Sequence, residues 1–259
     1  FIFGLIIYII TLIKSQKIII TKYWKYALSF NIPLIPHFLS TIILNQADRV
    51  MITKLCGADF TALYSVAYSL GMVTMLFSTA IQQALLPWLY TKLNKKDYSK
   101  ISEITNLTLI IVFTVCILLI LVAPEIMGIL APTSYADAVW VIPPVCASVF
   151  FVYLFNLFAN IEYYFEETKY VGTISIIAGI LNCILNYFFI NIYGFIAAGY
   201  TTLFCYIILA WLHYMCMKQI CKKHKFYNNI FNYKIMLMLI CIFLIFVLVI
   251  AALYKLLLI

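Results

Sequence analysis

Charged residues are scarce in this sequence. Asp, Glu, Lys and Arg make up 10% of the 259 residues, whereas hydrophobic residues make up 66%, and the mean hydropathy is +1.08. A soluble domain is closer to one quarter charged and one half apolar, so this composition excludes a soluble globular protein. It predicts an integral membrane protein.

Several motifs are also absent. The sequence has no glycine-rich phosphate loop, no G-x-S-x-G motif and no long polar segment that could form a catalytic domain. We therefore expect no enzyme activity, no catalytic residues and no cofactor. The eight cysteines stand mostly within apolar runs, where a thiol behaves as a small apolar side chain, so no disulfide framework is indicated.

Apolar runs long enough to cross a membrane recur along the chain. A helix needs about 20 residues to cross a hydrocarbon core of roughly 30 Å, and no alternating strand pattern is present. The predicted fold class is therefore all-α, a polytopic bundle of membrane helices. The first run is too short to span and starts at Phe1, so we expect it to be the end of a helix that begins upstream in a longer protein. The expected spans are 1–13 (partial), 32–54, 61–89, 105–124, 139–160, 171–191, 195–217 and 235–257.

Lysine is concentrated in every second break between these runs. Because positively charged loops stay in the cytoplasm, the alternation predicts cytoplasmic basic loops and an outward-facing C-terminus. The net charge of +8 then reflects helix ends at the lipid headgroups, and we expect no nucleic-acid partner. The lysines concerned are Lys14, Lys17, Lys22, Lys25, Lys92, Lys95, Lys96, Lys100, Lys169, Lys218, Lys222, Lys223, Lys225 and Lys234.

Two charged residues interrupt the second run. Asp48 and Arg49 belong to a helix that also carries His37, Thr41 and Asn45 at intervals of three and four residues, which places these polar side chains along one face. An Arg or Asp near the centre of a membrane helix costs roughly 2.5–3.5 kcal/mol on insertion scales and tends to mark a substrate or ion path. The alternative for Arg49 is a purely structural salt bridge.

Asp48 and Arg49 are neighbours in sequence, so their side chains point about 100° apart on a helix and a direct pair is awkward. Each residue is therefore expected to find another partner. Arg49 can reach Asn45 and Thr53 on its own helix. Candidates for a carboxylate partner of Arg49 are Asp59, Glu125 and Asp137.

Three further runs carry hydroxyl and amide side chains at helical spacing. Together with the second run, these stripes predict a bundle organised around a polar cavity. The runs 105–124 and 235–257 are almost wholly apolar and are expected to face lipid or close packing. For each polar residue the alternative is a contact between helices, worth about 0.6 kcal/mol. The stripes include Tyr64, Tyr68, Gln82, Asn156, Asn160, Asn182 and Asn186.

Two other polar clusters are given no functional role. His213, Cys216, Cys221 and His224 are residue types that bind zinc, but the lysines between them would repel a cation and the spacing fits no standard finger. We therefore expect no metal site. The cluster of Glu162, Glu166 and Glu167 is expected to be a solvated turn at the cytoplasmic surface.

Three segments together resemble one family of membrane exporters. The chain is similar, over about residues 20–218, to the C-terminal half of Wzx-type polysaccharide flippases, in the multidrug/oligosaccharidyl-lipid/polysaccharide exporter superfamily. The resemblance implies two six-helix lobes around a central cavity that opens alternately to each side. The three segments are IPLIPHFLSTIILNQADRVMITKLCGADFTALYSVAYSL, YADAVWVIPPVCASVFF and GILNCILNYFFINIYGFIAAGYTTL.

The resemblance also implies a division of the chain. Residues 1–13 would end a missing N-terminal lobe, 14–31 would be a cytoplasmic linker, and 32–217 would form the C-terminal lobe. Residues 218–234 would be a basic cytoplasmic loop, and 235–259 an accessory helix.

The implied function is transfer of polyprenyl-pyrophosphate-linked oligosaccharides between membrane leaflets, with the lipid-linked glycan and membrane lipids as partners. Arg49 would attract the pyrophosphate, and Asp48 is the residue expected to couple transport to a proton or sodium ion. The alternatives are an organic cation antiporter of the same superfamily and a membrane-embedded glycan polymerase. The residues expected to hydrogen bond to the glycan are Asn45, Tyr64, Tyr68, Gln82, Asn156, Asn160, Asn182 and Asn186.

Overall fold

The computed structural model describes residues 2–14, 21–226 and 230–257. Every element in these ranges is helical, and seven helical segments are long and apolar enough to cross a membrane. The predicted all-α polytopic bundle is thereby confirmed. Lys17, together with parts of the expected linker and basic loop, lies outside the described residues. The helices are α1 (Ile2–Lys14), α2 (Thr21–Asn31), α3 (Leu34–Leu55), α4 (Ala58–Gly71), α5 (Val73–Asn94), α6 (Ile101–Leu130), η1 (Thr133–Val141), α7 (Ile142–Tyr164), α8 (Thr168–Tyr193), α9 (Ala197–Lys223) and α10 (Tyr233–Leu257).

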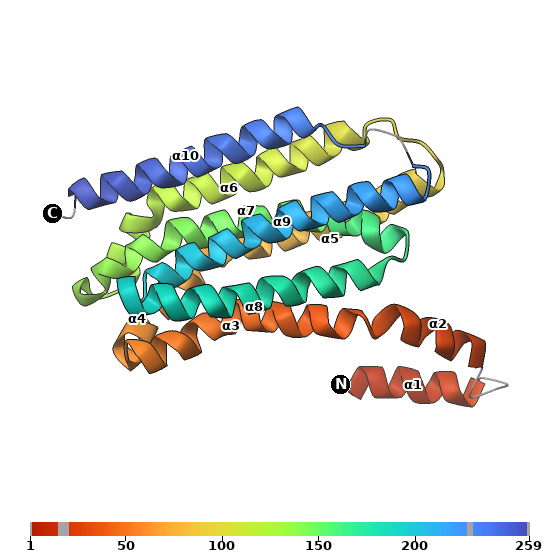
Figure 1. Ribbon diagram of the computed structural model, residues 1–259, viewed down its shortest axis with the longest axis horizontal. Coiled ribbons are helices and arrows are strands. Elements are labelled where there is room, and N and C mark those ends of the chain that lie inside the picture. Colours follow the sequence, from red (N-terminus) through yellow and green to blue (C-terminus); the bar gives the residue numbers. More distant parts are fainter. Residues whose placement is uncertain (1, 15–20, 227–229, 258–259) are drawn as a thin grey trace.

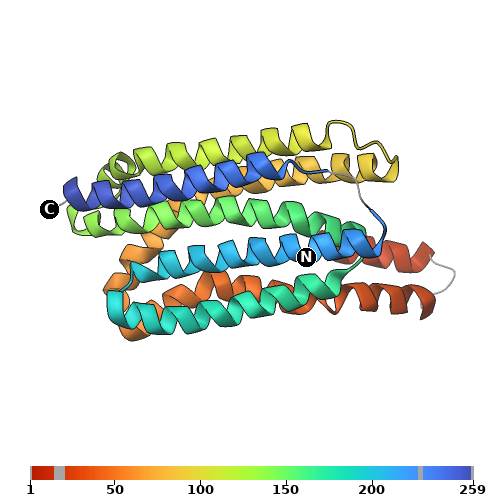
Figure 2. The same ribbon diagram turned by 45° about the horizontal axis from the view of Figure 1, so that its top comes forward.

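The long helices run roughly along one common axis (Figures 1 and 2). Helix α7 is the centre of the bundle, because it packs against α5, α6, α8, α9 and α10. Almost every side chain of α7 from Ile142 to Glu162 is buried. A helix that is apolar on all sides is expected to be surrounded by protein or lipid, and here α7 is surrounded by protein.

The basic connections gather at one end of the bundle. Figures 1 and 2 show that the α5–α6, α7–α8 and α9–α10 connections lie together, at the right of both views. The η1 segment and the α3–α4 and α8–α9 turns lie at the opposite end. The end with the α5–α6, α7–α8 and α9–α10 connections is called the basic end below, since it carries the lysine-rich breaks of the sequence.

The sequence did not predict one of the helices and one helix break. A helix, α2, occupies most of the segment expected to be a linker, and the expected run 61–89 is divided at Met72 into α4 and α5. At this division the hydroxyl of Thr74 donates to the carbonyl of Gly71 at 2.7 Å. The side chain thus satisfies a carbonyl that an uninterrupted helix would bond through its backbone.

Helices α3 and α8 approach each other closely where α8 has glycine. A Cβ atom on Gly172 would lie 2.1 Å from the carbonyl oxygen of Pro33, whereas one on Gly179 would lie 3.4 Å from the nearest atom of Ser40. Small residues allow membrane helices to approach in this way. Gly172 is therefore required by the packing, and Gly179 is only favoured.

Replacing Gly172 with alanine is expected to destabilise the protein by about 1–3 kcal/mol, the usual cost of overpacking a well-packed contact. The nearest neighbour is backbone, which cannot move aside as a side chain would. Thermal unfolding in detergent would measure the change, with Gly179→Ala on the same face as the control. Equal unfolding temperatures for the two variants would contradict the close approach.

Candidate functional site

The Asp48 carboxylate is fully buried where α3, α4, α8 and α9 meet. It accepts three hydrogen bonds from neutral donors. Tyr64 Oη and Thr202 Oγ1 donate to Oδ2 at 2.6 and 2.9 Å, and Asn186 Nδ2 donates to Oδ1 at 2.6 Å. The sequence prediction that Asp48 has a partner other than Arg49 is consistent with these contacts.

A second layer of amides and hydroxyls holds those donors in place. Asn186 Nδ2 also donates to Asn182 Oδ1 at 3.1 Å, and Asn182 Nδ2 donates to Thr202 Oγ1 at 3.0 Å. The hydroxyl of Thr201 donates to Asn186 Oδ1. Asn182 and Asn186 are both fully buried, so they lie in the contact between helices and do not line an open cavity.

The Asp48 carboxylate forms no ion pair with a Lys, Arg or His of the described residues. The ion pairs of the described residues join Lys92 to Asp97, His213 to Glu162, and Lys223 and His224 to Glu167. A buried carboxylate without a cation carries a large desolvation cost, which three neutral hydrogen bonds offset only in part. The arrangement suits a group that takes up a proton or a small cation.

Arg49 lies beside this network and faces an open groove of about 490 Å³. Its Nη1 donates to Gln46 Oε1 at 2.8 Å, and its guanidinium carbon lies 4.6 Å from the centroid of the Tyr68 ring. The Nε–H group is buried and has no hydrogen-bond partner among the described residues. None of the carboxylates considered from the sequence forms an ion pair with Arg49 in the described part of the chain.

A small cavity connects the groove to the Asp48 network. Asn45 Oδ1 accepts hydrogen bonds from Tyr68 Oη at 3.2 Å and Tyr206 Oη at 3.3 Å. These three residues and Thr202 line a cavity of about 20 Å³, and Asn45 and Tyr68 also line the groove. Such a volume is sufficient for about one water molecule. The cavity thus shares Asn45 and Tyr68 with the groove and Thr202 with the Asp48 network.

The other predicted site residues lie away from the groove. Gln82 on α5 and Asn156 on α7 are half-buried, and Asn160 is buried. Gln82 Oε1 and Asn160 Nδ2 have no hydrogen-bond partner in the described part of the chain, while the backbone carbonyl of Asn160 accepts from Tyr90 Oη at 3.2 Å. None of the three lines the groove of Arg49. The structure thus unites Asn45, Tyr64, Tyr68, Asn182 and Asn186 with the two charged residues, but not these three.

Helices α7 and α9 are also joined by a buried acid–base pair that was not predicted. Glu162 was predicted to be solvated, and this prediction is wrong, because the residue is fully buried. Its Oε1 lies 2.8 Å from Nδ1 of the equally buried His213. The ring of His213 stacks on Phe155, and neither Glu162 Oε2 nor His213 Nε2 has a partner among the described residues. The sequence spacing could have indicated that His213 is buried, because it lies seven residues after Tyr206 and so on the same face of α9.

The other two acidic residues of that turn bind groups at the basic end. Tyr26 Oη donates to Glu166 Oε1 at 2.7 Å. Glu167 pairs with Lys223 and, at 3.2 Å, with His224. The hydrogen bond from Lys223 is the main reason why the pKa of Glu167 is lowered from its ordinary value. His213 and His224 thus have separate carboxylate partners.

These features define a multi-pass membrane protein with an intramembrane polar site. Residues 1–93 match the model of a family described as polysaccharide biosynthesis protein. This range contains the first of the three segments that resemble polysaccharide exporters, together with Asp48, Arg49, Tyr64 and Tyr68. The match confirms the family resemblance for this part of the chain.

One curated relative is similar to part of the chain. It is the Lsg locus putative protein 1 of Haemophilus influenzae, which is 31% identical over 71 residues. The aligned stretch is 27% of this chain and 18% of the relative, so the chain matches less than one fifth of that protein.

Proposed function

We propose that the chain is part of a transporter that moves polyprenyl-pyrophosphate-linked oligosaccharides from the inner to the outer leaflet, for export of a surface polysaccharide. The observation that supports this proposal most directly is that the Arg49 guanidinium lies at an open groove and forms no ion pair with a carboxylate of the described residues. The residue lies in the range that matches the polysaccharide biosynthesis family. Arg suits this role because its planar donors fit the oxygens of a phosphate group.

The groove addresses the main physical barrier to such transport. A glycan head group that enters hydrocarbon loses water from many hydroxyl groups, at a few kcal/mol for each one that finds no new hydrogen bond. Asn45, Gln46, Tyr68 and Ser69 supply polar groups along the groove beside Arg49. In the proposed mechanism the pyrophosphate binds at Arg49, the sugars exchange hydrogen bonds with these side chains, and the polyprenyl tail stays in the bilayer.

Asp48 is proposed to couple this movement to a proton or sodium ion. It forms no ion pair with a described residue, and Thr202, which donates to it, lines a small cavity together with Asn45, which also lines the groove. Uptake of a cation at Asp48 would change the hydrogen bonds that join α3, α4, α8 and α9. A change in helix contacts of this kind can favour one side of an alternating-access cycle over the other.

The organisation of the whole transporter is also a proposal. Residues 32–217 would form one six-helix lobe, with 14–31 as the linker from another lobe, 218–234 as a basic loop and 235–259 as an accessory helix. The protein would lie in the inner membrane with its basic end in the cytoplasm, as the distribution of lysine favours. An inside-negative potential then favours outward movement of an anionic substrate by about 2.3 kcal/mol per charge per 100 mV.

Arg49→Gln is expected to lower delivery of lipid-linked glycan to the outer leaflet by about 10- to 100-fold, because a hydrogen bond to a charged group contributes about 1.5–3 kcal/mol. Arg49→Lys keeps the charge but loses the planar set of donors, so its activity should be intermediate. The measurement is appearance of labelled lipid-linked glycan at the outer face of proteoliposomes that contain the complete transporter.

Lys54→Gln is the matched control, because Lys54 is an exposed cation on the same helix, one and a half turns away. It should transport at the normal rate. Full activity of Arg49→Gln, at equal protein level, would remove Arg49 from the mechanism. Loss of activity in all three variants would show a general effect of charge on this helix.

A further inference from the structure

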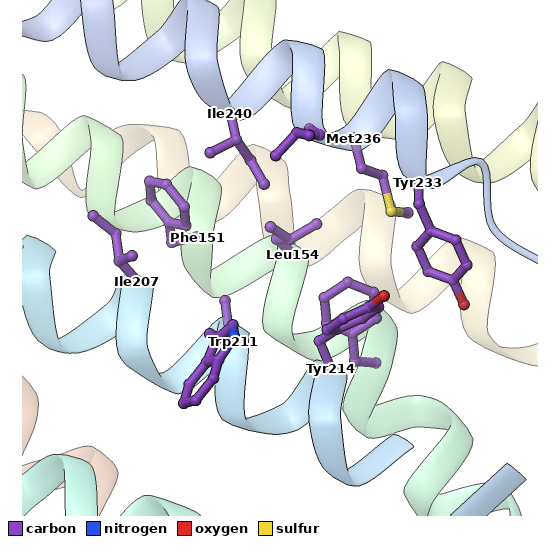
Figure 3. Close-up of a pocket in the computed structure, with 11 residues that line it drawn as sticks. Phe151, Leu154, Ile207, Trp211, Tyr214, Tyr233, Met236 and Ile240 are labelled. Carbon is purple, nitrogen blue, oxygen red and sulfur yellow. The ribbon is translucent and has the colours of Figure 1, made fainter. Parts of the chain in front are cut away.

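A second groove lies on the side of the bundle, between α7, α9 and α10, and has a volume of about 360 Å³ (Figure 3). Its walls are apolar and aromatic, with Phe151 and Leu154 from α7, Trp211 and Tyr214 from α9, and Tyr233 and Met236 from α10. Trp211 is 59% exposed. In a membrane-spanning bundle, a groove with such walls is open to hydrocarbon chains.

A cation lies beside two of the rings that line this groove. The Nζ atom of Lys218 lies 4.9 Å from the centroid of the Tyr214 ring and 5.8 Å from that of Tyr233, and both rings line the groove. Lys218 forms no ion pair with a carboxylate of the described residues. The exposed side chains of Lys222 and Lys234 follow on the same two helices. The apolar groove therefore has, at the basic end, a neighbouring ammonium group that forms no ion pair with a described residue.

We propose that this groove binds one anionic phospholipid from the leaflet at the basic end, with an acyl chain along the apolar walls and the phosphate at Lys218. Charge must supply the selectivity, because an apolar groove gains little by exchanging one lipid chain for another. A lysine near the surface attracts an anionic lipid enough to favour it by about fivefold over a neutral one. This inference does not depend on the proposed transport function.

A third groove provides an internal comparison. It lies between α8 and α9 near their connection, at the opposite end of the bundle, and has a volume of about 640 Å³. Its lining includes Phe189, Tyr193 and Phe204, and no Lys or Arg of the described residues lies over one of these rings, as Lys218 does over Tyr214 and Tyr233. The two grooves thus share apolar and aromatic walls and differ in the cation. The second should prefer anionic lipids and the third should not.

Tryptophan fluorescence can test this preference. Trp211 lies seven residues from Lys218, about 10 Å along the helix, so bromine atoms near the middle of an acyl chain would quench its emission. The protein is placed in vesicles of phosphatidylcholine that contain either brominated phosphatidylglycerol or brominated phosphatidylcholine. The signal of Trp211 is the difference in quenching between the unmodified protein and Trp211→Phe.

We expect brominated phosphatidylglycerol to reach Trp211 with an apparent affinity about fivefold higher than brominated phosphatidylcholine. Lys218→Gln should remove this preference, and Lys169→Gln, at an exposed lysine of the same end, should retain it. A tryptophan introduced as Phe204→Trp in the Trp211→Phe background should report no preference in the third groove. Circular dichroism would verify that each variant is folded.

Equal quenching of Trp211 by the two lipids would overturn the proposal, as would a preference that survives Lys218→Gln. A preference of the same size at Phe204→Trp would also overturn it, since the effect would then come from the bilayer surface as a whole. Displacement of phosphatidylglycerol by a small fraction of polyprenyl phosphate would assign the groove to an isoprenoid chain and reject a resident phospholipid.

Discussion

Asp48→Asn is expected to leave the protein folded and to abolish ion-driven export. The asparagine oxygen can still accept from Tyr64 and Thr202, which both donate to Oδ2 of the aspartate. Its amide group can donate to Asn186 after that side chain rotates, which gives up the bond from Asn186 to Asn182, so the three contacts at residue 48 survive. The group that could take up a proton or sodium ion is lost. Each coupled charge contributes about 2.3 kcal/mol per 100 mV of membrane potential, or roughly a 50-fold change in attainable accumulation.

The measurement is accumulation of lipid-linked glycan at the outer face of proteoliposomes under an imposed proton or sodium gradient. Accumulation by the unmodified protein should respond to one of the two gradients, whereas accumulation by Asp48→Asn should respond to neither. Asp59→Asn is the matched control, because Asp59 is an exposed carboxylate at the start of α4. An unchanged gradient dependence in Asp48→Asn would exclude Asp48 as the coupling residue.

Asp48→Leu distinguishes the electrical role of this residue from its structural role. Leucine leaves Tyr64, Thr202 and Asn186 without their acceptor, at about 1–3 kcal/mol for each buried donor that remains unpaired. This variant should therefore unfold at a lower temperature than Asp48→Asn, although both lack the charge. If Asp48→Asn were as unstable as Asp48→Leu, its loss of export would have to be attributed to misfolding.

The helices were predictable because length and hydropathy decide whether a segment can cross a membrane. The division at Met72 was not predictable in the same way. A local hydrogen bond from Thr74 to Gly71 accompanies the break, but threonine makes similar bonds within uninterrupted helices, so its presence does not predict one. Helix α2 was missed because its mixture of lysine and aromatic residues also fits an interfacial linker.

The polar stripes identified part of the candidate site, but they did not predict which of its residues line a groove and which are packed between helices. Spacing of three and four residues identified Asn182 with Asn186, and Tyr64 with Tyr68, as pairs that share a helix face. It did not show whether a face lines a cavity or packs against another helix, because both environments shield polar groups from lipid. Asn182 and Asn186 are in packed contacts, and Arg49 is beside an open groove. The difference depends on which helices are neighbours.

Glu162 shows the opposite difficulty. In the sequence it stands a few residues before Glu166 and Glu167 and close to a helix end, which is the usual setting of a solvated carboxylate. Only the tertiary structure brings His213 from α9 to within 2.8 Å of it. The local pattern therefore predicted an exposed residue where the fold contains a fully buried pair.

Breaking this buried pair is expected to destabilise the protein more than any other single change considered for α7 and α9. Glu162→Ala removes the partner of His213 in a site with no solvent, and breaking a buried pair typically costs 3–5 kcal/mol, on the order of the whole stability of a small domain. His213→Ala should have a similar effect, since it leaves the Glu162 carboxylate without its donor. Unfolding in detergent, by heat or by added denaturant, would measure both changes.

The double variant Glu162→Met/His213→Leu provides the decisive comparison. It replaces both polar groups with apolar side chains, and such exchanges of a buried pair are often neutral or even stabilising. Its loss of stability should therefore be much smaller than the sum of the two single losses.

Asp97→Asn is the control for an ordinary ion pair. Lys92 donates to Asp97 at 2.5 Å and lowers the pKa of that carboxyl to about 2, so this contribution is present at neutral pH and is lost only as the pH falls below the ordinary value toward 2. Because the Lys92–Asp97 pair is partly exposed, Asp97→Asn should change stability little at neutral pH. If the two alanine variants were as mild as Asp97→Asn, or if the apolar double variant were as unstable as their sum, the Glu162–His213 contact would not hold α7 to α9.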